Sequence, residues 1–100
     1  MSHTQHATSQ VARLIPLGQL VATPHALALL EKAKLSTFAI FARHEQGDWG
    51  DVDIEDAIAN EQALIDGGRL MSVYKLEIGT VWVITEADRS ATTLLLPEEY

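Results

Sequence analysis

The sequence contains no cysteine in its 100 residues, and this absence excludes several kinds of site at once. A chain without thiols forms no disulfide framework, offers no thiolate ligand to a metal and has no cysteine nucleophile. The same absence is typical of proteins in a reducing compartment, so we expect a cytoplasmic protein.

Long apolar runs are also absent. A transmembrane helix needs about 20 predominantly apolar residues, whereas the apolar run at residues 26–30 is followed at once by Glu31 and Lys32. The first residues, "MSHTQHATSQ", have no apolar core of the kind that a secretory signal contains. We therefore expect no membrane contact, a disordered tail over residues 1–10 and a single domain over residues 11–100.

Positive charge is scarce, because 7 Lys and Arg residues stand against 14 Asp and Glu residues, which gives a net charge of −7. Such a charge repels phosphate backbones over a Debye length of roughly 10 Å. Direct contact with nucleic acid is therefore not expected, and a protein partner with a basic surface fits the charge better. The hydrophobic share of 47% is that of an ordinary folded domain with one core.

The residues that are present predict three helices in the first two thirds of the chain. Pro24 follows a capping residue, which is a typical helix start, and Gly47 and Gly67 are typical helix ends. The expected N-caps are Thr23, Ser36 and Asp53. We expect the first helix over residues 24–33, the second before residue 47 and the third before residue 67.

From Arg69 the pattern changes to short runs rich in β-branched and aromatic residues. The runs "RLMSVYKL", "TVWVIT" and "ATTLLL", separated by short turns, predict three antiparallel strands. Pro16 and Gly18 interrupt an earlier extended segment, so any strand there is short or lies at a sheet edge. The predicted class is α+β, with two or three short helices packed on a three- or four-stranded antiparallel sheet.

Four stretches carry a family resemblance: "LGQLVATPHALALLEKA", "FARHEQGDWGDV", "ANEQALIDGGRLMSVY" and "VWVITEADRSATTLLLPEEY". They resemble a family of small proteins of bacterial plasmids and integrative elements, whose members often carry a label naming them a type I restriction-modification subunit M. A methyltransferase needs a Gly-rich turn for its methyl donor and an aromatic proline loop for a flipped base, and the sequence has neither. The resemblance therefore implies only a role on a mobile genetic element, near defence or counter-defence genes. It brings no catalytic residue and no cofactor.

The strongest signal is an acidic segment, because residues 45–66 contain eight of the 14 acids and no Lys or Arg. One interpretation is a solvated helix whose acids favour the positive end of the helix dipole. The other is a negative surface that docks on a basic groove. On the second interpretation the partner-binding residues are Asp48, Trp49, Asp51, Asp53, Glu55, Asp56 and Glu61.

Two residues and one segment in this part of the chain need separate interpretation. Trp49, between two glycines, is either a lid folded onto the core or an exposed anchor for a partner. His44 lacks the second histidine of a zinc-protease helix, so we expect a surface or capping residue. Residues 51–62 begin like a calcium loop but have Asp56 and Gln62 where that loop needs Gly and Glu, so no metal is predicted.

The leading hypothesis is a small, acidic, non-enzymatic protein of a mobile element that binds a protein partner without a cofactor. Its most specific form is a counter-defence inhibitor that occludes the nucleic-acid groove of a restriction or CRISPR-type complex. An alternative is a small nuclease or toxin that uses Arg89, Ser90 and Thr92, with the Arg stabilising a phosphorane. A third is a homodimer in which a sheet edge or an apolar helix face pairs with itself.

Overall fold

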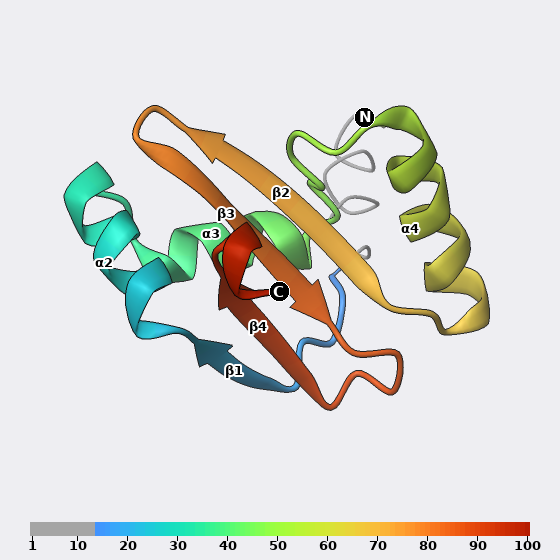
Figure 1. Ribbon diagram of the computed structural model, residues 1–100. Helices are drawn as coiled ribbons and strands as arrows, with labels where there is room; N and C mark the ends of the chain where they lie inside the picture. Colours follow the sequence, from blue (N-terminus) through green and yellow to red (C-terminus); the bar gives the residue numbers. More distant parts are fainter. Residues whose placement is uncertain (1–13) are drawn as a thin grey trace, which may run out of the picture.

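The computed structural model describes residues 14–100 and contains three α-helices packed against a four-stranded sheet (Figure 1). The elements are β1 (Gln19–Ala22), α2 (Pro24–Ala33), α3 (Thr37–Glu45), α4 (Ile54–Asp66), β2 (Leu70–Leu76), β3 (Gly79–Thr85), β4 (Ala91–Leu95) and the short 3₁₀-helix η1 (Pro97–Glu99). The α+β class is therefore confirmed. The tail expected at residues 1–10 lies outside the described part of the chain.

The helices begin and end at the residues that the sequence indicated. The side chains of Thr23, Ser36 and Asp53 each accept a hydrogen bond from a backbone N–H in the helical turn that follows. These bonds satisfy amides that have no partner within the helix. Gly67 ends α4 with a φ of 88°, a left-handed conformation in which a side chain would be strained.

The sheet has the strand order β1-β4-β3-β2, so β1 and β2 are its two edges. Strands β2, β3 and β4 are antiparallel neighbours, as expected from their short turns. Strand β1 lies at an edge, as Pro16 and Gly18 indicated, but it runs parallel to β4. All three helices lie between β1 and β4 in the sequence, which provides the long connection that a parallel pair requires.

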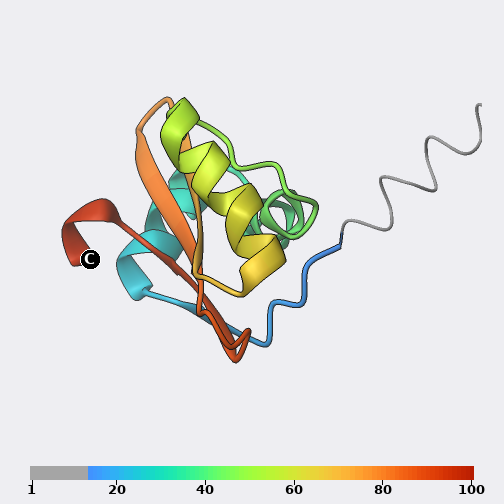
Figure 2. The same ribbon diagram turned by 90° about the vertical axis from the view of Figure 1, so that its right-hand side faces the viewer.

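The core lies between the helices and one face of the sheet. Its main cluster joins α2 and α3 to strands β2, β3 and β4 and consists of Ala26, Leu30, Ile40, Phe41, Tyr74, Val81, Val83 and Leu94. A second cluster, under α4, consists of Ile15, Trp49, Ala63 and Leu70. Figure 2 shows α3 and α4 on one side of the sheet and η1 on the other. Within residues 14–100, no helix has the length and apolar character that a membrane span requires.

The opposite face of the sheet is covered only in part. Trp82 lies on this face, half-buried, and its ring meets the ring of Tyr100 edge to face with centroids 5.4 Å apart. Glu99 ties the C-terminal segment down, because its carboxylate accepts a hydrogen bond from the hydroxyl of Thr23 at 2.7 Å. The last residues therefore pack against strands far away in the sequence.

The outer edge of β2 is closed by the loop between α3 and α4. The N–H of Val73 donates to the carbonyl of Trp49 at 3.1 Å, and the N–H of Asp51 donates to the carbonyl of Val73 at 2.6 Å. Further along the strand, the N–H of Lys75 donates to the carboxylate of Asp51 at 2.8 Å. The loop thus acts as a short additional strand that satisfies backbone groups at a sheet edge.

Asn60 of α4 closes the remaining part of the same edge. Its side-chain amide donates to the carbonyl of Met71 at 2.8 Å and accepts from the N–H of Met71 at 3.0 Å. Asn60 is only 4% exposed, so these bonds are well shielded from water. A single amide side chain here replaces the two backbone bonds that a neighbouring strand would make.

We expect Asn60→Ala to lower the free energy of unfolding by about 2 kcal/mol, because it leaves a shielded N–H and C=O without partners. Urea denaturation measures this loss. Gln62→Ala, on the exposed side of the same helix, is the matched control and should change stability by less than about 0.5 kcal/mol. Equal effects of the two substitutions would contradict the edge-closing role of Asn60.

Candidate functional site

The acidic segment divides into carboxylates that hold the fold together and carboxylates that face solvent. Asp48 belongs to the first group, because its Oδ2 lies 2.7 Å from Nε of Arg43 and its Oδ1 accepts from the N–H of Gly50 at 3.1 Å. The hydrogen bond from Arg43 lowers the pKa of Asp48 below its ordinary value. Asp51 and Asp53 also accept hydrogen bonds from backbone amides. These three acids therefore have structural roles.

Trp49 is buried, with 7% of its surface exposed, as expected of a lid on the core. Its indole N–H donates to the carboxylate of Glu61 at 3.0 Å. The ring also packs edge to face against the imidazole of His44, with centroids 5.7 Å apart. An exposed anchor, the alternative interpretation, does not describe the position of Trp49 in this structure.

The other three predicted residues lie on α4. Glu55 and Asp56 occupy its first turn, where the helix dipole favours negative charge, and both are exposed. Glu61 is also exposed and lies one to two turns further along, where it contacts Trp49. The helix has four acids and no Lys or Arg, so its solvent side is strongly negative.

The apolar residues of α4 do not all lie on its buried side. The spacing of Ile54, Ala57, Ile58, Ala63, Leu64 and Ile65 indicates a partly amphipathic helix, but Ile54 is 74% exposed, Ile58 is 62% exposed and Ile65 is 80% exposed. The helix instead turns Asn60 and Ala63 inward. Because α4 lies beside the edge of β2, small and amide side chains fit there better than large apolar ones.

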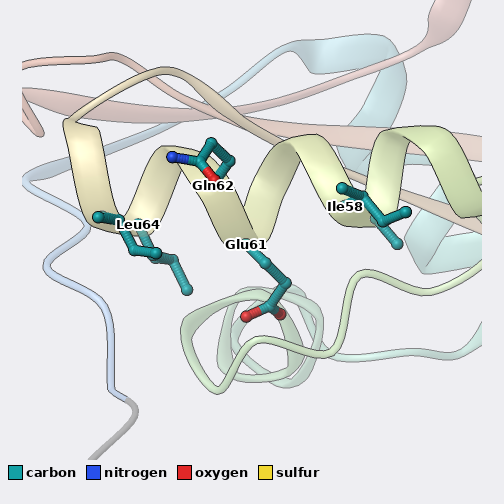
Figure 3. Close-up of a pocket in the computed structure, with 6 residues that line it drawn as sticks. Ile58, Glu61, Gln62 and Leu64 are labelled. Carbon is teal, nitrogen blue, oxygen red and sulfur yellow. The ribbon is translucent and has the colours of Figure 1, made fainter.

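The exposed isoleucines form one surface with their polar neighbours. A spacing of four and then seven residues places them on a single face of the helix. We call the following residues the α4 surface: Ile54, Glu55, Ile58, Glu61, Gln62, Ile65 and Asp66. A shallow hollow of about 540 Å³ lies along it, and within the described chain its lining comes entirely from α4. Figure 3 shows Ile58, Glu61 and Leu64 along this hollow, with Glu61 directed toward the loop that follows α3.

The residues of the nuclease alternative are engaged within the fold. The guanidinium of Arg89 donates to the carbonyls of Gly68 at 2.7 Å and Ala63 at 3.2 Å, at the C-terminal end of α4. Thr92 is fully buried, and its hydroxyl donates to the carbonyl of Leu17 at 2.7 Å. Only Ser90 of this group is exposed. These contacts account for Arg89 and Thr92 without a substrate.

His44 is fully buried, and the expectation of a surface or capping residue is wrong. Its Nδ1 lies 2.6 Å from the hydroxyl of Ser72 on β2, and its Nε2 lies 2.8 Å from the hydroxyl of Thr85 on β3. Residues near His44 in the sequence do not indicate its burial, because its two hydroxyl partners are 28 and 41 residues away. Pairing with these hydroxyls is what allows a polar ring to lie in the core.

His44, Ser72, Thr85 and Thr92 form a buried hydrogen-bonded cluster, and the bond that Thr92 donates determines the direction of the bonds before it. Thr92 gives its only hydroxyl proton to a carbonyl, so it must accept from Thr85, 2.7 Å away. Thr85 in turn must accept from the protonated Nε2 of His44. In the neutral ring Nδ1 carries no proton and accepts from the hydroxyl of Ser72. Burial, and secondarily the positive charge of Arg89, lowers the pKa of His44 to about 4.

Within residues 14–100, no three His, Asp or Glu side chains lie close enough together to hold a metal ion. Comparisons of the chain with protein-family models, with curated proteins and with solved structures found no match. The candidate site therefore rests on its own geometry, which is that of an exposed acidic and apolar helix.

We expect stability to depend on pH through His44, whose pKa falls from an ordinary 6.5 to about 4 on folding. Between these values the unfolded chain binds a proton that the folded chain does not. The free energy of unfolding should therefore fall by about 3 kcal/mol as the pH is lowered through this range. Urea denaturation at several pH values measures the fall.

His44→Gln removes the titrating group, so its unfolding free energy should lack most of this pH dependence. His25→Gln is the control, because the side chain of His25 is 79% exposed and lies outside the buried cluster around His44. A wild-type chain that is as stable near pH 4 as near pH 7 would rule out a buried neutral imidazole.

Proposed function

We propose that the protein is a non-enzymatic binding domain that docks on a protein partner through the α4 surface. The observation that supports this most strongly is the exposure of Ile54, Ile58 and Ile65, which are 62% to 80% exposed on one face of α4. Scattered apolar residues are normal on a protein surface, but a row of large ones along a helix is typical of an interface.

The charge of this face indicates the kind of partner. Glu55, Glu61 and Asp66 flank the isoleucines, and α4 itself contains no Lys or Arg. A partner with apolar side chains surrounded by Lys or Arg would bury the isoleucines and neutralise the carboxylates. Electrostatic attraction of this kind raises the association rate and selects against acidic partners.

Occlusion of a nucleic-acid groove is the specific form of binding that we propose. Such grooves combine basic side chains with apolar or aromatic ones, because they hold phosphates and stack bases. The α4 surface offers carboxylates in place of phosphates, and the net charge of −7 favours approach to a basic groove. The resemblance to small proteins of mobile elements implies a role near defence or counter-defence genes, and on that basis we propose a restriction or CRISPR-type complex as the target.

We expect Ile58→Ser combined with Ile65→Ser to weaken partner binding by about 100-fold, because burial of each isoleucine stabilises a complex by roughly 1.5 kcal/mol or more. The measurement is capture from a lysate of defence-positive cells, followed by calorimetry with the purified partner. Phe38→Ser is the matched control, since Phe38 is 75% exposed on α3 and outside the α4 surface. Equal binding by the double variant and the control would reject the α4 surface.

Charge variants test the acidic part of the surface separately. Glu55→Gln with Asp66→Asn keeps the hydrogen-bond capacity of each site and should slow association, most clearly at low ionic strength. Asp51 and Asp53 are less informative targets, because each holds a backbone N–H and its loss would destabilise the fold. Thermal denaturation of every variant separates lost binding from lost stability.

The counter-defence role has its own test. We expect expression of the chain to raise the survival of unmodified phage or plasmid DNA in a host with an active restriction or CRISPR-type system. The Ile58→Ser and Ile65→Ser variant should not protect. Undiminished restriction, with partner binding intact, would reject the counter-defence role and leave the binding function standing.

A further inference from the structure

The two edges of the sheet differ in whether other parts of the chain cover their backbone groups. The edge of β2 is closed by Trp49, Asp51 and Asn60, whereas β1 has no comparable cover within the described residues. Gln19, Leu20 and Val21 are exposed, and only Ala22 is partly shielded. Figure 1 shows β1 at the outer margin of the sheet, with no helix or loop alongside its free edge.

The backbone groups of β1 define what this edge can accept. The N–H groups of Gln19 and Thr23 donate to the carbonyls of Ser90 and Leu94 on the β4 side. Because neighbouring residues of a strand point in opposite directions, the N–H and C=O of Leu20 and Ala22 are directed away from β4. A segment of extended backbone is the partner that satisfies such a row of groups.

We propose that two copies of this chain associate through antiparallel pairing of β1 with β1, which joins their sheets into one continuous sheet of eight strands. A two-fold axis beside Val21 would pair Leu20 of each copy with Ala22 of the other and form four backbone hydrogen bonds. The same surface then serves on both copies, as a two-fold symmetric interface requires. This inference does not depend on the proposed function of α4.

The absence of charged side chains on β1 favours a second copy of this chain as the partner of its free edge. Residues 14–30 include no Asp, Glu, Lys or Arg, although the chain as a whole has a net charge of −7. This uncharged segment contains the whole of β1, so no charged side chain of β1 itself opposes the approach of a second copy. Charged side chains, which commonly protect exposed edges from pairing, are absent at this edge.

The position of α4 favours the same arrangement. Helix α4 lies beside β2, and the strand order places β2 at the other end of the sheet from β1. In the dimer the two acidic helices would lie at opposite ends, which keeps their like charges far apart. By contrast, dimerisation through α4 itself would bring Glu55, Glu61 and Asp66 of two copies together.

Side chains on both faces would add to the backbone bonds. Leu20 is 42% exposed and Val21 is 41% exposed, and consecutive residues of a strand point to opposite faces of the sheet. On the two-fold axis Val21 meets Val21 of the second copy, and Leu20 lies opposite Ala22. Cross-strand apolar pairs of this kind stabilise antiparallel neighbours.

Sedimentation velocity of the full chain over a range of concentrations tests this proposal. We expect a species of twice the chain's mass that dissociates on dilution. Leu20→Pro should remove it, since proline lacks the outward N–H and is tolerated at a free edge. Val21→Lys is a second variant, which places two positive charges opposite each other across the axis. Far-UV circular dichroism and thermal denaturation establish that each variant is folded.

Ile58→Lys on α4 is the matched control and should leave the dimer unchanged. A dimer that persists in both β1 variants, or that dissociates in the α4 variant, would assign the interface to another surface and overturn the proposal. A wild-type chain that keeps the mass of one copy at every concentration would also overturn it. Absence of a dimer leaves partner binding by α4 standing, because that binding is measured with the separate Ile58→Ser and Ile65→Ser variant.

Discussion

Closure of the outer edge of β2 is the constraint on which the arrangement of the molecule depends. Backbone groups at a sheet edge need partners, and this fold provides them from Trp49, Asp51 and Asn60. The amide of Asn60 reaches Met71 only if α4 lies directly alongside β2. That position determines which side of α4 is buried, and it directs the large isoleucines to solvent. The candidate binding surface is therefore a consequence of how the sheet edge is closed.

The scarcity of cations gives the carboxylates two distinct uses. Arg43 pairs with Asp48, and Arg89 binds carbonyls at the end of α4. Other acids are satisfied by backbone N–H groups, as at Asp51 and Asp53, because a charged acceptor strengthens such a bond. The acids of α4 have no cation on their own helix and remain a source of negative potential. Acidic side chains thus stabilise the loop between α3 and α4, and they also make the solvent side of α4 negative.

The buried cluster around His44 fixes how the layers fit together. It joins α3 to β2, β3 and β4 and continues to the carbonyl of Leu17, just before β1. Thr85 and Thr92 each donate once and accept once, and Ser72 donates to Nδ1 of the neutral ring, so the cluster forms only when all three strands are in register. A polar cluster of this kind specifies one arrangement of the core, whereas apolar packing alone tolerates small shifts.

Local sequence determined the elements of this fold, and tertiary structure decided their surroundings. Caps, glycines and β-rich runs depend on neighbouring residues, so they predicted the bounds of α2, α3 and α4 and the antiparallel order of β2, β3 and β4. The acidic segment was visible for the same reason. The parallel pairing of β1, the burial of His44 and the exposure of the isoleucines depend on contacts between distant residues. Periodicity identifies two sides of a helix, but only packing against the edge of β2 decided which side of α4 faces water.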